Sequence, residues 1–170
     1  MIALLCSVQA EAQLLLAHLV VTGMTRLGSK SIIAGTLAGQ QVLLCVGGMG
    51  KVNAAHAAAL MIAEFSADRL LIFGVGGAYP ASGAVVGDIV LAQVEIAGDE
   101  GVLTHDGFKD MEYIGIPLLK TATSVIFTTY PASEPLLKQA LRTLDSPSEP
   151  GRTDVHVGPF VTLSTCTGTT

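Results

Sequence analysis

Glycines that follow a short apolar strand are the residues best suited to binding a ligand. The apolar run at 70–73 predicts a buried strand, and Gly74, Gly76 and Gly77 come directly after it. A ligand can approach the backbone closely at these positions, because glycine carries no Cβ. In open α/β sheets, ligands bind at the carboxyl ends of the strands. The stretch 74–101 therefore predicts the floor of a small-molecule site, unless its glycines only let a helix cross the strand closely.

Carboxylates are the second group that could do chemistry. Glu11 follows the strand expected at 2–7 and stands at its carboxyl end. The first turn of a helix also favours an acidic residue, because the helix dipole stabilises its charge, and position alone favours this plainer role. Asp88 is expected to cap a turn or to pair with a nearby amide. Acidic residues after the next strand predict a solvated loop; they are Glu95, Asp99 and Glu100.

The glycine-rich segment GGMGKV at 47–52 resembles a phosphate-binding loop at first sight. A P-loop needs glycine and Ser or Thr at two positions that Cys45 and Val52 occupy here. A dinucleotide fingerprint counted from Gly48 would need glycine where Asn53 stands. The segment predicts instead a tight strand-to-helix turn, whose helix N-terminus either faces a ligand or serves packing alone.

Metal and covalent chemistry find little support in the sequence. The four histidines show no metal-ligand spacing, and no cofactor or metal is expected. Cys166 lies among threonines with no identifiable base, so we expect a small residue in a packed loop rather than a nucleophile. Cys6 and Cys45 lie in apolar runs and are expected to be buried and reduced, as is typical of a cytoplasmic protein.

The composition predicts one folded domain over residues 1–170, with a hydrophobic core. Half of the residues are hydrophobic and 14% are charged, which excludes a disordered chain. The net charge is −5 and the nine basic residues are scattered, so no nucleic-acid partner is expected. No apolar run has the length of a membrane span, and no membrane partner is expected.

Strands and helices that alternate along the chain must position these residues. Strands are expected at 2–7, 31–37, 41–46, 70–73, 88–94 and 155–163, and helices at 10–20, 51–65 and 135–144. Residues 98–116 are expected to form a surface loop, and residues 146–153 a polar loop. This alternation predicts an α/β fold with a mostly parallel central sheet that is covered on both faces.

Together these segments resemble the nucleoside phosphorylase and nucleosidase family over the whole chain. IALLCSVQAEAQLL is similar to the family's opening strand and the acid beyond it, GGMGKVNAA to its strand-to-helix turn, and FGVGGAYPASGAVVGDIVLA to its glycine floor. The resemblance implies a three-layer phosphorylase/hydrolase-like fold with a central twisted mixed, mostly parallel sheet. It implies too that the C-terminal part of this fold is missing, because the family's Met-Glu motif and later catalytic Asp do not occur here.

The resemblance also implies an activity, the hydrolysis of an N-glycosidic bond. The family uses a glutamate near the end of its first strand to activate water, which makes a catalytic role the favoured interpretation of Glu11. The pocket floor would be formed by Val75, Gly76 and Gly77. The base pocket would be lined by Thr165, Cys166, Thr167 and Gly168. The partner implied is a small nucleoside, and a homo-oligomer is expected by analogy.

The loops VEIAGDEGV, HDGF and VTLSTCTGT resemble the futalosine-hydrolase branch of the family. That branch implies cleavage of futalosine into hypoxanthine and dehypoxanthine futalosine in menaquinone biosynthesis. Methylthioadenosine/S-adenosylhomocysteine nucleosidase and purine nucleoside phosphorylase are alternatives. Phosphorolysis is disfavoured, because its anion site usually contains arginine and neither glycine loop has one. An alternative outside the enzymes is a non-catalytic fragment that binds a nucleoside.

Overall fold

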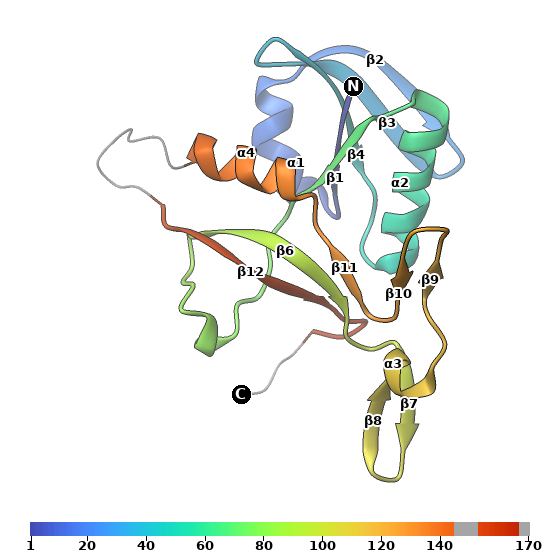
Figure 1. Cartoon of the computed structure of the whole chain (residues 1–170). Coiled ribbons are helices and arrows are strands. Elements are labelled where there is room, and N and C mark those ends of the chain that lie inside the picture. Colours follow the sequence, from blue (N-terminus) through green and yellow to red (C-terminus); the bar gives the residue numbers. More distant parts are fainter. Residues whose placement is uncertain (145–152, 167–170) are drawn as a thin grey trace. The chain divides into compact units, whose positions relative to one another are not determined.

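The computed structural model describes residues 1–144 and 153–166, and its chain divides into two compact units (Figure 1). The first unit comprises Met1–Gly77, and the second begins at Ala78. Each unit has its own sheet. The single domain expected over 1–170 stays a prediction.

The first unit is built on a five-stranded sheet in the order β2-β3-β4-β1-β5. Its strands are β1 (Ile2–Cys6), β2 (Val20–Leu27), β3 (Lys30–Leu37), β4 (Gln40–Val46) and β5 (Arg69–Ile72). Strand β1 pairs in parallel with β4 and β5, whereas β2, β3 and β4 form an antiparallel meander. The sheet is therefore mixed, and its parallel part brings the carboxyl ends of β4, β1 and β5 to one edge.

Helices α1 (Gln9–His18) and α2 (Lys51–Phe65) cover opposite faces of this sheet (Figure 1). Successive residues of a strand point to opposite faces, so β1 and β4 contribute to two separate apolar clusters. The cluster under α2 contains Ala3, Leu5, Ile32, Leu43, Cys45, Ala57 and Met61. The cluster under α1 contains Leu4, Cys6, Ala12, Leu19, Val42 and Leu44. The first unit thus has the three layers, helix, sheet and helix, that the sequence predicted.

Most of the predicted elements of the first unit lie within one or two residues of their expected bounds. Helix α2 has the expected bounds, and the hairpin between β3 and β4 turns at Ala38 and Gly39, both with positive φ. Strand β2 was not expected, and the first helix ends at His18 rather than at residue 20. Residues of β2 are mostly exposed on both faces, so the strand lacks the apolar alternation that predicts one.

The second unit contains a three-stranded sheet in the order β11-β6-β12. Its elements are β6 (Ile89–Ala97), β11 (Thr129–Pro131), β12 (Val155–Thr162) and α4 (Glu134–Leu144), with a short 3₁₀ turn at Pro80–Ser82. Strand β6 pairs in parallel with β12 and antiparallel with β11. The strands and the helix expected in this region are confirmed. The polar loop expected at 146–153 lies outside the described residues, apart from Thr153.

The surface loop expected at 98–116 is wrong. This region holds a hairpin of β7 (Gly101–Thr104) and β8 (Gly107–Asp110), followed by the short helix α3 (Met111–Ile114). Asp110 caps α3 by accepting a hydrogen bond from the amide of Tyr113 at 3.0 Å. These elements are too short for their periodicity to be visible in the sequence. A further two-stranded ladder joins β9 (Leu119–Lys120) to β10 (Val125–Ile126).

Candidate active site

The carboxylate of Glu11 is held by three backbone amides of the first unit. Oε2 accepts hydrogen bonds from the amides of Ser7 at 2.9 Å and Val8 at 3.0 Å, and Oε1 accepts one from the amide of Val75 at 3.0 Å. Glu11 stands in the first turn of α1, and its bond to Val8 is the capping contact of that helix. The same side chain also reaches the segment after β5, which helix capping does not require.

These amides control the ionisation of Glu11. Partial burial works against the charged form, but the amides of Val75, Val8 and Ser7 outweigh it and hold the pKa of Glu11 below its ordinary value. Glu11 is therefore a carboxylate at neutral pH, which is the form that can accept a proton.

The backbone of Gly74 approaches this carboxylate closely. A Cβ at residue 74 would collide with Oε1 of Glu11 and lie 2.9 Å from its Cδ. Only glycine fits here, because a carboxylate occupies the space of a side chain. Gly76 and Gly77 are exposed, and a Cβ at either would meet no atom within 4 Å. Of the predicted floor, Val75 is thus in contact with Glu11, whereas Gly76 and Gly77 line open space.

The turn between β4 and α2, residues 47–50, lies beside the end of β1. The amide of Gly47 donates to the carbonyl of Cys6 at 2.8 Å, and the amide of Gly48 donates to that of Ser7 at 3.0 Å. Gly48 and Gly50 have φ of 93° and 95°, a conformation that favours glycine. The predicted strand-to-helix turn is confirmed, and the segments that follow β1, β4 and β5 meet at one edge.

Lys30 is a residue of this region that sequence reasoning missed. Its side chain is buried, and its ammonium donates hydrogen bonds to the carbonyl of Gly47 and, at 2.7 Å, to Oδ1 of Asn53. A single sequence gives no signal for this contact, because a lysine at the start of a strand is ordinarily exposed.

The remaining predicted site residues belong to the second unit or are not described. Thr165 and Cys166 follow β12 and are exposed, and Cys166 is a free thiol. Thr167 and Gly168 lie outside the described residues. A role of all four in binding the base stays a prediction.

Asp88 pairs with an amide, as expected, and also with a histidine that sequence reasoning did not connect to it. Its Oδ2 accepts from the amide of Val85 at 2.9 Å and lies 2.9 Å from Nε2 of His156. The amide of Val85 and, after it, His156 lower the pKa of Asp88 against the opposing effect of desolvation. Asp88 therefore ties the start of β6 to the start of β12.

The solvated acidic loop predicted after β6 is wrong for Glu95, whereas Asp99 lies in the turn that follows this strand. Glu95 lies within β6, where burial raises its pKa, and Oδ2 of Asp99 accepts from the amide of Ser164 at 2.7 Å. Strand β6 continues past its expected end at residue 94, which places Glu95 in the sheet. Within the ranges that the structure describes, no group of three or more His, Cys, Asp or Glu side chains could hold a metal ion, and no helix could span a membrane.

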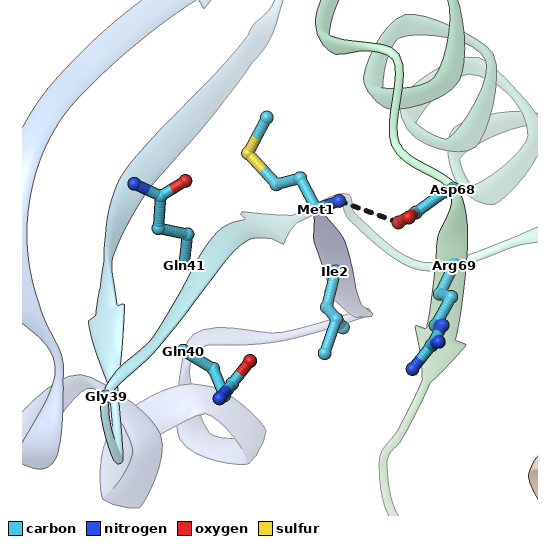
Figure 2. A pocket seen from close by; sticks show the side chains of 7 residues that line it. All are labelled: Met1, Ile2, Gly39, Gln40, Gln41, Asp68 and Arg69. Carbon is cyan, nitrogen blue, oxygen red and sulfur yellow. Dashed lines mark hydrogen bonds and ion pairs between the residues drawn. The ribbon is translucent and has the colours of Figure 1, made fainter.

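A shallow pocket lies at the opposite edge of the first unit's sheet, at the amino ends of β1, β4 and β5 (Figure 2). Its lining consists of Met1, Ile2, Gly39, Gln40, Gln41, Asp68 and Arg69. The amino group of Met1 pairs with Asp68 at 2.7 Å across it. Ligands of α/β sheets bind at the carboxyl edge, so the candidate site is the Glu11 edge and not this pocket.

Several known proteins resemble this chain in sequence. The family model described as "Phosphorylase superfamily" matches residues 1–170. The futalosine hydrolase of Thermus thermophilus is 33% identical over 97 residues, which are 57% of this chain and 40% of that protein. The 5'-methylthioadenosine/S-adenosylhomocysteine nucleosidase of Lysinibacillus sphaericus is 29% identical over 116 residues, 68% of this chain and 50% of that protein. The chain thus spans about half the length of the curated relatives it matches.

A solved structure shares the fold. The methylthioadenosine/S-adenosylhomocysteine nucleosidase of Colwellia psychrerythraea, in complex with adenine, superposes with a TM-score of 0.78 at 22% identity. The match covers 96% of this chain and 62% of that one. The α/β architecture predicted from the sequence is therefore confirmed.

Proposed function

The chain belongs to the phosphorylase superfamily, and we propose that its protein hydrolyses the N-glycosidic bond of a purine nucleoside, with futalosine as the substrate. One observation carries the proposal, namely the Glu11 carboxylate held by amides at the carboxyl edge of the parallel strands. Relatives named as futalosine hydrolase and as methylthioadenosine/S-adenosylhomocysteine nucleosidase support the reaction class.

Glu11 has one oxygen available for the reaction. A carboxylate oxygen has two lone-pair directions, and Oε2 uses both for the amides of Ser7 and Val8. Oε1 accepts from Val75 alone among the described residues, so it retains one direction for a water molecule. In the proposed step this water attacks the anomeric carbon, its proton passes to Oε1, and the electron pair of the broken C–N bond leaves with the base. General-base assistance of this kind contributes on the order of 10²–10⁴ in rate.

The proposed substrate is held by backbone groups on one side of the sugar and by a base pocket. Val75, Gly76 and Gly77 are proposed to form the floor. The base pocket is proposed to be lined by Thr165, Cys166, Thr167 and Gly168. No cofactor takes part in this proposal.

The distribution of arginine supports water over phosphate as the nucleophile. Arg69 lies at the amino end of β5, on the far edge of the sheet from Glu11. Arg26 lies on the edge strand β2, which β3 and β4 separate from β1. Neither glycine segment contains an arginine that would fix an anion. An assay in the presence and absence of phosphate tests this choice, since a phosphorylase yields sugar 1-phosphate and stalls without phosphate.

The choice of futalosine rests on the similarity to the Thermus thermophilus enzyme and on the loop sequences VEIAGDEGV and VTLSTCTGT. With futalosine as its substrate, the protein is proposed to act in menaquinone biosynthesis. It is also proposed to be cytoplasmic and to form a homo-oligomer. The experiment compares kcat/KM of the natural protein for futalosine, methylthioadenosine and S-adenosylhomocysteine. A preference for either adenine nucleoside would replace futalosine while keeping the reaction. Binding of hypoxanthine without any turnover would favour the alternative of a non-catalytic nucleoside-binding fragment.

A further inference from the structure

Lys30 is the one charged side chain that is buried among residues 1–144 and 153–166, with 5% of its surface exposed. Transfer of an ammonium group out of water is unfavourable unless hydrogen bonds replace the lost hydration. Lys30 donates to two neutral oxygens, the carbonyl of Gly47 and Oδ1 of Asn53. A charged donor strengthens such hydrogen bonds, so the ammonium holds its two acceptors firmly.

The two acceptors lie at opposite ends of the turn 47–50. Gly47 directly follows β4, and Asn53 lies in the first turn of α2. The amide of Asn53 also donates from Nδ2 to the carbonyl of Met49 at 2.8 Å, inside the turn. Gly48 and Gly50 have positive φ and no side chain to restrain them, so the turn depends on contacts from outside. Lys30 supplies two of these contacts, one at Gly47 and one at Asn53.

The turn 47–50 also contacts the backbone that holds Glu11. The amide of Gly48 donates to the carbonyl of Ser7, and the amide of Ser7 donates to Oε2 of Glu11 at 2.9 Å. Hydrogen bonds that are joined through the backbone of residues 47–48 and of Ser7 therefore link the Lys30 ammonium to the carboxylate.

We propose that Lys30 is a positioning residue, which fixes the turn 47–50 against Ser7 and thereby fixes the amides that orient the Glu11 carboxylate. The proposal rests on the proposed function, because it takes Glu11 to be the general base of the hydrolysis. Simple space-filling by the Lys30 side chain is the competing explanation. Methionine separates the two, because it keeps the length of the chain and removes every donor.

The experiment compares Lys30→Met with the unaltered natural protein and with Met61→Ala. Met61 lies in the C-terminal half of α2 and is buried in the core cluster, so its variant is expected to lower the melting temperature without disturbing Glu11. Lys30→Met is expected to lower kcat about tenfold or more, because small displacements of catalytic groups are costly, and to change KM by less than about threefold. The acid limb of kcat/KM is expected to move to higher pH in Lys30→Met only. A loss of kcat that follows the melting temperature alike in both variants, with an unmoved acid limb, would overturn the proposal.

A measurement without turnover keeps the two proposals distinguishable. The Glu11 carboxyl carbon is titrated by NMR in the unaltered protein and in Lys30→Met, with Glu11→Gln identifying the signal. The expected result is a higher pKa for Glu11 in Lys30→Met, because its amide donors are no longer aligned. An unchanged titration overturns the positioning role. If the unaltered protein hydrolyses no nucleoside, the proposed function fails, and the titration still decides the role of Lys30.

Discussion

The carboxylate of Glu11 accepts a hydrogen bond at 3.0 Å from the amide of Val75, which lies 64 residues further along the chain. This contact joins the start of α1 to the segment that follows β5. With the amides of Ser7 and Val8, it surrounds one carboxylate with backbone from two neighbouring strand ends. Glu11 therefore does more than cap its helix, and its position can be tested separately from its charge.

Replacement of Glu11 by glutamine is expected to lower kcat on the order of 10²–10⁴-fold, because an amide cannot accept the proton of water. The fold is expected to persist, with some loss of melting temperature where the new NH₂ group faces an amide donor. Steady-state hydrolysis and circular dichroism measure the two effects. Glu64→Gln, on the exposed side of α2, makes the same chemical change elsewhere and should leave kcat unaltered. Full activity in Glu11→Gln would remove Glu11 from the mechanism.

Gly74→Ala tests the position of the carboxylate without changing its charge. The new Cβ would overlap with Oε1 of Glu11, so the side chain must move away from the amide of Val75. We expect a fall in kcat of about tenfold or more and a loss of stability of about 1–3 kcal/mol. Gly23→Ala is the matched control, since a Cβ there meets nothing within 4 Å. Equal kinetics for the two variants would show that the Glu11 position is unimportant.

The sequence predicted a helix, strand or turn well where one short stretch of residues contained both its composition and its boundaries. Helix α2 begins after Gly50 and ends before Ser66, whose φ is 52°, and the Ala-rich run between them has no competing structure. The strand-to-helix turn and the hairpin at Gly39 were equally predictable, because the sequence shows the glycines that adopt positive φ in both turns. The hairpin of β7 and β8 was not predicted, because strands of four residues are too short to show a period of alternating polarity.

The candidate site was predictable only in part, because its contacts join distant segments. The position of Glu11 after β1 was visible in the sequence, but its bond to Val75 exists only once β5 pairs with β1. The burial of Lys30 depends likewise on the packing of α2 over the start of β3. The pairing of Asp88 with His156 needs β6 and β12 side by side. Propensity and motif spacing contain none of this information.

The three cysteines are expected to react with a thiol reagent in two phases. Burial raises the pKa of Cys6 and, in spite of the nearby Lys30 charge, that of Cys45, so both thiols are shielded and largely protonated. Cys166 is exposed and should react first. Ellman titration of the native protein measures the phases, and Cys166→Ser should remove the fast one. A fast phase that persists in Cys166→Ser would place a buried cysteine within reach of solvent.

Asp88 is expected to make the stability of the protein depend on pH in the acid range. Its pKa in the folded state is lowered, so its contribution is present above the ordinary pKa of aspartate, about 3.9, and is lost as the pH falls through the folded value. Asp88→Asn should therefore melt at a lower temperature than the unaltered protein at pH 7, and the gap should close as the pH falls below about 4. Asp106→Asn removes the same charge from an exposed turn and controls for net charge. Thermal denaturation followed at several pH values measures the gap. A gap of constant size across this range would mean that Asp88 stabilises β6 and β12 through something other than its ionised carboxylate.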